Sequence, residues 1–112
     1  MKYISTRNSQ NFFSSEQVLN YGLAPDGGLF IPKHLPKFSQ DSINSLKGSS
    51  YQDIAFFILK PFLSDLFSDI EIKKIIEEAY MNFDKEIVTS SSLGDNYLLN
   101  LFHGPTLAFK DY

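Results

Sequence analysis

Hydrophobic residues recur at helical spacing in the middle of the chain and predict its clearest helix. The apolar positions of this stretch are Ile72, Ile75, Ile76, Ala79, Tyr80 and Phe83. Residues three, four, seven and eight positions apart share one face of an α-helix, and charged residues here occupy the other face. Ser68 and Glu71 have the spacing of a capping box, in which each side chain binds the backbone amide of the other residue. The pattern predicts an amphipathic helix that begins after Ser68 and extends to Phe83.

Three shorter helices are predicted upstream by their capping residues. Ser14 stands three residues before a glutamine and two turns before Gly22, so a helix of about two turns is expected between them. A second short helix is expected at residues 41–47. A third follows Ser50, and we expect Pro61 to end or kink it, because proline lacks the amide donor that the helix needs.

Short strands and tight turns complete the N-terminal part of the pattern. Residues 3–5 and 29–31 are rich in aromatic and branched side chains, and we expect a strand at each, the second stopped by Pro32. The Pro-Asp-Gly-Gly sequence at residues 25–28 predicts a tight turn between them. The predicted fold class is therefore α+β, with short strands and about four helices.

The serine-rich stretch at residues 90–96 is typical of a flexible connection between structural units. The stretch at residues 97–102 is apolar and predicts a mostly buried strand. We therefore divide the chain into a domain at residues 1–92 and the start of a second domain at residues 93–112.

The end of the chain carries the candidate chemistry. Thr106 is expected to cap a new helix, and the chain stops before that helix can form its hydrogen bonds. Asp111 could orient a neighbouring residue or favour the N-terminus of that helix, and we expect the second role. The sequence therefore looks truncated. A strand that leads through a turn into a helix start is how α/β proteins place reactive groups at the edge of a sheet. Lys110 is the strong nucleophile candidate there, and we expect His103 to be a packed turn residue.

Composition narrows the functional classes. With 43% hydrophobic residues, 11 Phe and 6 Tyr, the 112 residues suffice for one small folded domain. A net charge of -3 disfavours binding to nucleic acid, and two histidines without cysteine disfavour a metal site. The longest wholly apolar run, residues 54–59, is far shorter than the roughly 20 residues of a membrane span. No export signal is recognised at the start, and a cytoplasmic location is expected.

Four separated segments resemble the threonine synthase family. The sequence FHGPTLAFKD at residues 102–111 is similar to the family's lysine motif for pyridoxal 5'-phosphate. Residues 3–7, 22–32 and 50–62 are similar, in the same order, to the family's N-terminal domain. The resemblance implies an N-terminal domain cut from a larger α/β enzyme of the tryptophan synthase β-like fold, fold type II.

The resemblance also implies a reaction and its residues. Lys110 would be the residue that binds the cofactor as a Schiff base and then carries protons, and Phe109 would flank the cofactor, although an aromatic side chain there also suits a core. The family substrate is O-phosphohomoserine, which reacts with water to give threonine and phosphate. The partner of this chain would be the remainder of its own protein, without which we expect no activity.

Two alternatives remain open. A related phospho-lyase would use the same Lys110, eliminate phosphate from a similar substrate and release a keto acid. A non-catalytic docking domain would instead use Phe102, Leu107 and Phe109 as an exposed binding patch. Analysis of the product of the intact protein distinguishes the phospho-lyase from a threonine synthase. The length of the encoded protein distinguishes the docking domain from an enzyme.

Overall fold

The computed structural model describes residues 1–83 and 86–112 and begins with a small antiparallel sheet. Strand β1 (Lys2–Ser5) lies at the centre of this sheet, between β2 (Phe13–Ser14) and β3 (Phe30–Pro32). The α+β class is confirmed, and β2 is an element that the sequence pattern did not predict.

Helix α1 (Ser15–Tyr21) follows β2 directly and packs against the sheet. The predicted capping box is present: the Gln17 amide donates to Ser14 Oγ at 3.2 Å, and the Ser14 amide donates to Gln17 Oε1 at 2.9 Å. The Phe13 ring meets the Phe30 ring edge-on, with 4.9 Å between centroids. We call β1, β2, β3 and α1 the sheet unit.

The strand predicted at residues 29–31 is shifted by one residue: β3 ends at Pro32 itself, which still pairs with Tyr3. Strand β3 lies at the edge of the sheet, where a residue without an amide donor is tolerated. The turn predicted at residues 25–28 is confirmed. Gly27 has a φ of +76°, and its amide donates to the Ala24 carbonyl at 2.8 Å.

Three helices follow the sheet unit: α2 (Gln40–Ser45), α3 (Tyr51–Leu63) and α4 (Asp69–Tyr80). Helix α3 continues through Pro61 instead of ending before it. Proline here lies in the last turn, so it removes one hydrogen bond, while the Ser64 amide still donates to the Lys60 carbonyl at 3.0 Å.

Helix α4 begins at the predicted capping box but ends at Tyr80, three residues earlier than expected. Ile72 and Ile76 are buried, with 0% and 2% of their surface exposed, and the helix that carries them packs against α3. Ile75 is 41% exposed and Ala79 is also exposed, so the buried stripe is narrower than the apolar pattern predicted.

The C-terminal part contains a β-hairpin of β4 (Thr89–Leu93) and β5 (Asn96–Asn100). The flexible connection expected at residues 90–96 was wrong, because most of it is strand β4. Strand β5 matches the strand predicted from residue 97, but it is exposed: Tyr97 is 83% and Leu99 59% accessible. The pairing of β4 and β5 satisfies the hydrogen-bonding groups of their backbones, while most side chains of the hairpin remain exposed.

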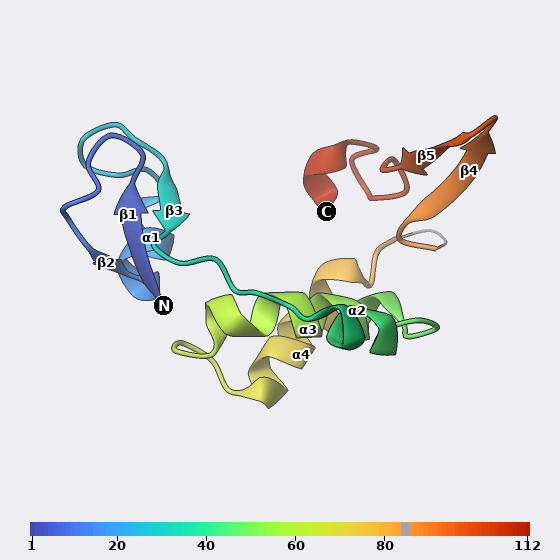
Figure 1. Cartoon of the computed structure of the whole chain (residues 1–112), viewed down its shortest axis with the longest axis horizontal. Coiled ribbons are helices and arrows are strands. Elements are labelled where there is room, and N and C mark those ends of the chain that lie inside the picture. The colour runs from blue at the N-terminus through green and yellow to red at the C-terminus, as the bar shows by residue number, and fades with distance from the viewer. Residues whose placement is uncertain (84–85) are drawn as a thin grey trace.

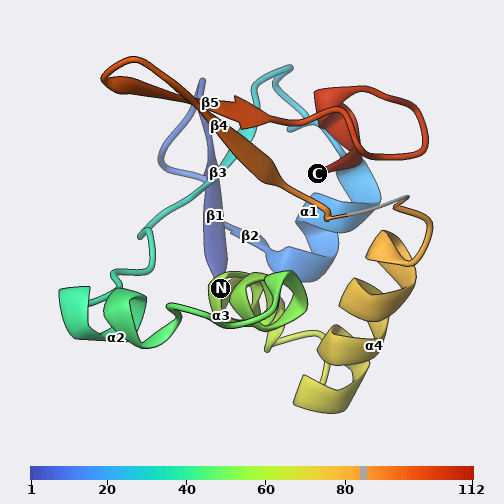
Figure 2. The same ribbon diagram turned by 90° about the vertical axis from the view of Figure 1, so that its right-hand side faces the viewer.

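The chain is elongated, with extents of 45 × 30 × 28 Å. The sheet unit and the hairpin lie at opposite ends of the long direction, with α3 and α4 below and between them (Figure 1). The view from the side shows α4 reaching up towards the C-terminal segment (Figure 2). The C-terminal segment therefore has the hairpin on one side and the helices on the other.

Candidate active site in the lysine loop

The residues after the hairpin form an irregular segment that we call the lysine loop, residues 103–112. It ends in a single turn of 3-10 helix, η1 (Phe109–Asp111), and Lys110 lies at the centre of that turn with an exposed side chain. Phe109 is 67% exposed. The two predicted site residues are thus adjacent and both accessible from solvent.

The helix expected after Thr106 was wrong. The residue before η1 is Ala108, which provides no side-chain cap, and Leu107 has a left-handed backbone with a φ of +58°. A leucine in this conformation interrupts a right-handed helix. Thr106 is therefore free of a capping role and hydrogen-bonds elsewhere.

Asp111 receives both hydrogen bonds of Thr106. Its Oδ2 accepts from the Thr106 amide at 2.8 Å, and its Oδ1 accepts from Thr106 Oγ1 at 2.6 Å. Asp111 lies in the single turn of η1, and its carboxylate also binds a residue five positions upstream. Asp111 holds the start of the loop to its end.

The start of the loop is also anchored to the hairpin. His103 Nε2 lies 2.9 Å from Thr89 Oγ1, which in turn accepts from Asn100 Nδ2 at 3.1 Å. The His103 amide donates to the hydroxyl of Tyr112 at 2.8 Å. His103 therefore acts as the packed turn residue that the sequence predicted.

A column of aromatic rings connects the loop to the helices. Tyr112 meets Phe83 edge-on at 5.2 Å between centroids, Phe83 lies 5.3 Å from Tyr80, and Tyr80 lies 4.9 Å from Tyr51. Burial, together with Tyr80 and Tyr112, raises the pKa of the Tyr51 hydroxyl above its usual range. The Tyr51 hydroxyl is therefore uncharged at physiological pH. The column connects the loop to the helices through the packing of its rings.

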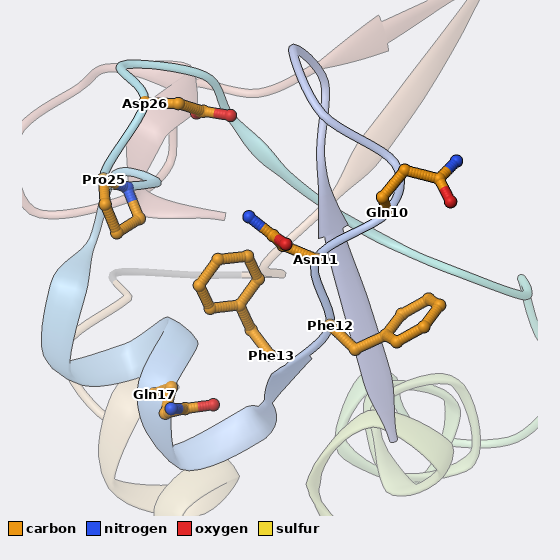
Figure 3. Close-up of a pocket in the computed structure, with 7 residues that line it drawn as sticks. All are labelled: Gln10, Asn11, Phe12, Phe13, Gln17, Pro25 and Asp26. Atoms are coloured by element: carbon orange, nitrogen blue, oxygen red, sulfur yellow. The ribbon is translucent and has the colours of Figure 1, made fainter.

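Another hollow lies on the sheet unit, away from Lys110 (Figure 3). The Phe13 ring points into it, while Phe12 points to the other side of the strand. Two of its polar side chains already have protein partners: Asp26 accepts from Ser5 and from the Gly28 amide, and Gln17 belongs to the capping box. This hollow therefore offers little for chemistry.

Within residues 1–83 and 86–112, no three His, Asp or Glu side chains gather in a way that could hold a metal ion. No helix in the described part of the chain combines the length and apolarity that crossing a membrane requires.

The chain is thus a small α+β unit that leads through a hairpin to an exposed lysine. The model of the threonine synthase N terminus matches residues 2–80. The chain belongs to the threonine synthase family, and the resemblance noted in the sequence is confirmed.

Individual relatives extend the similarity to the lysine loop. Threonine synthase from Pseudomonas aeruginosa is 44% identical over 114 residues, which cover 100% of this chain and 24% of that protein. The structure of pyridoxal-phosphate-bound threonine synthase from Brucella melitensis is 38% identical, with a TM-score of 0.91 over 99% of this chain and 24% of its own. Yeast threonine synthase has a TM-score of 0.85, at 38% identity over 98% of this chain and 23% of its own. The chain spans about a quarter of the length of these relatives.

Proposed function

We propose that this chain supplies the N-terminal domain and the cofactor lysine of a pyridoxal-phosphate-dependent threonine synthase. The intact enzyme would convert O-phospho-L-homoserine and water to L-threonine and phosphate. The single observation that carries the proposal is the exposed Lys110 in the lysine loop of a chain that is similar to threonine synthases along its whole length.

The residues of the lysine loop fit this cofactor in part. Lys110 has an accessible primary amine, the group that binds an aldehyde, and Phe109 beside it offers an accessible apolar face. When bound, pyridoxal phosphate supplies an electron sink that stabilises negative charge on the substrate. The phosphate of the cofactor would be held by residues outside this chain. The turn at residues 25–28 is a poor alternative for holding that phosphate, because its Gly28 amide already donates to Asp26 Oδ1.

Lys110 would serve twice. Its Nζ would hold the cofactor through the aldehyde, and the same Nζ, once free, would take and return a proton at the substrate Cα. Phe109 would limit the motion of the cofactor by packing against it. One residue thus provides both attachment and proton transfer, which explains why the position of the lysine loop matters.

The remainder of the protein would cover the exposed apolar residues near the loop. Phe102 is 52% and Leu107 72% exposed, and Phe109 is similarly accessible. A patch of this kind is typical of a surface that another part of the protein covers. The division into residues 1–92 and 93–112 stays a prediction, as does the inactivity of the chain alone. The same patch would also suit a docking domain, whose function would not require Lys110.

The test is the replacement Lys110→Ala in the intact protein, meaning this chain together with the rest that its relatives possess. We expect turnover to fall by roughly a thousandfold or more, with the fold unchanged, because the exposed side chain contributes chemistry and little packing. Steady-state rates and circular dichroism measure the two effects. A variant with wild-type rates would refute the assignment.

Borohydride trapping with pyridoxal phosphate gives a second test. In the intact protein we expect peptide mapping to find the label on Lys110 almost alone, because a complete site selects one amine. In the 112-residue chain we expect comparable labelling of other exposed lysines, such as Lys2, Lys33 and Lys73. Selective labelling of Lys110 in the short chain would contradict the proposal that residues beyond it build the site.

The phospho-lyase alternative shares Lys110 and differs in its product. Incubation of the intact protein with O-phosphohomoserine distinguishes the two: threonine supports the synthase, and a keto acid supports the lyase.

A further inference from the structure

Lys110 lies inside a ring of hydrogen bonds that closes on Asp111. The Asp111 amide donates to the Ala108 carbonyl at 3.1 Å, which forms the turn around Lys110. The Asp111 carboxylate then reaches back to the amide and the hydroxyl of Thr106, at 2.8 Å and 2.6 Å. The backbone is therefore tied down on both sides of the lysine.

Packing reinforces this ring at Gly104. Gly104 is buried, and a Cβ atom added there would lie 2.4 Å from Asp111 Oδ2 and 2.5 Å from Asp111 Cβ. No carbon atom fits at these distances, so the Asp111 side chain lies directly against the glycine backbone. The Gly104 carbonyl accepts from the Leu107 amide at 3.0 Å, which closes the turn that contains the left-handed Leu107.

We propose that Asp111 is a positioning residue for Lys110, an inference that rests on the proposed function. Its carboxylate binds two donors of Thr106 and fixes the turn on which Lys110 is carried. Hydrogen bonds to a charged acceptor are stronger than those between neutral groups. Since η1 is one turn long and has no side-chain cap, this carboxylate is the group that sets the direction of the Lys110 side chain.

The test uses the intact protein and four variants: Asp111→Asn, Thr106→Val, Thr106→Ser and, as a control, Asp95→Asn. Asp95 is an exposed carboxylate in the hairpin turn, so its replacement removes the same charge away from the ring. The primary readout is the rate at which pyridoxal phosphate becomes attached to Lys110, followed by borohydride trapping. The second is the pH dependence of the absorbance of the bound cofactor, which a loss of stability alone would not shift.

We expect Asp111→Asn to slow attachment by roughly tenfold or more, the equivalent of one lost charge-assisted hydrogen bond, and to shift the pH profile. Thr106→Val keeps the carboxylate and the side-chain volume, so it should fold normally and give a smaller effect in the same direction. Thr106→Ser, which retains the hydroxyl, and Asp95→Asn should behave as the wild type.

The contact with Gly104 gives an independent check by a double-mutant cycle. Gly104→Ala alone should resemble Asp111→Asn, because the new Cβ displaces the carboxylate. In an Asp111→Gly background the same change should add little, since the displaced side chain is already absent. Fully additive losses would overturn the proposal.

The outcomes separate this inference from the function on which it rests. If Asp111→Asn attaches the cofactor at the wild-type rate with an unchanged pH profile, Asp111 has no positioning role, while Lys110 remains the cofactor residue. If the wild-type protein is labelled at another lysine, the proposed function fails and the role of Asp111 fails with it.

Discussion

Asp26 illustrates how a single exposed residue stabilises the sheet unit. Its carboxylate accepts from Ser5 Oγ at 2.7 Å and from the Gly28 amide at 2.9 Å, and these bonds, with a contribution from Arg7, lower its pKa below the usual range of an aspartate. A carboxylate with a lowered pKa in the folded state contributes stability above its unfolded pKa and loses it as the pH falls through the folded value. The hydrogen bonds of Asp26 therefore matter most at neutral pH.

We expect Asp26→Asn to reduce the dependence of stability on pH below about 4. The wild-type unfolding free energy should fall more steeply between pH 4 and pH 2 than that of the variant, and thermal unfolding across this range measures the difference. Parallel curves for the two proteins would show that Asp26 has the same pKa in both states.

The space around Gly28 leaves no room for a side chain. An added Cβ would lie 2.2 Å from Ser5 Oγ, and Gly28 is buried beneath the turn. We expect Gly28→Ala to destabilise the chain by about 1–3 kcal/mol, as overpacking of a filled site does. Denaturant unfolding measures the loss. The double variant with Ser5→Ala should recover part of it, because the nearest obstacle is the Ser5 hydroxyl.

At the scale of one element, α4 shows that an apolar residue of an amphipathic helix is not always a buried one. Ile76 is 2% exposed and Ile75, its neighbour in sequence, is 41% exposed. Ile76→Asp should destabilise the chain by about 3 kcal/mol or more, because it places an unpaired charge between α3 and α4. Ile75→Asp is the matched control and should cost far less. Equal losses in denaturant melts would contradict the burial of only one of the two side chains.

At the scale of the whole molecule, Asp65 connects the sheet unit to the helices. This residue lies between α3 and α4, and its carboxylate binds the amino group of Met1 and accepts from Ser15 Oγ at 2.8 Å. Burial raises the pKa of Asp65, but the hydrogen bonds from the amino group and from Ser15 outweigh it, so the net pKa is lowered. The ionised carboxylate is therefore the form that joins the two parts.

We expect Asp65→Asn to loosen the sheet unit more than the helices. Amide hydrogen exchange should become faster in residues 1–32, while the exchange of α4 stays close to that of the wild type, because the helices keep their own contact. Mass spectrometry of peptides from both regions measures this. Uniform acceleration across the chain would show that the two parts unfold together.

Much of the secondary structure could be predicted from the sequence because its signals are local. Ser14, Ser50 and Ser68 each cap the helix that the sequence placed after them, through bonds to the residue three positions on. The capping interaction spans less than one helical turn, so the chain neighbours alone determine it. The family resemblance of the lysine motif was equally readable, since it depends on the order of residues in one short segment.

Contacts between distant segments decided the rest. Strand β4 has a serine-rich sequence with weak strand preference, and its pairing with β5 makes it a strand. The side of α4 that is buried depends on where α3 lies, and the role of Asp111 depends on a left-handed Leu107 that bends the loop back to Thr106. The sequence by itself determined where helices start and which residue carries the candidate chemistry. Only the tertiary structure decided which faces are covered and what holds Lys110 in place, because both depend on partners that sequence spacing does not identify.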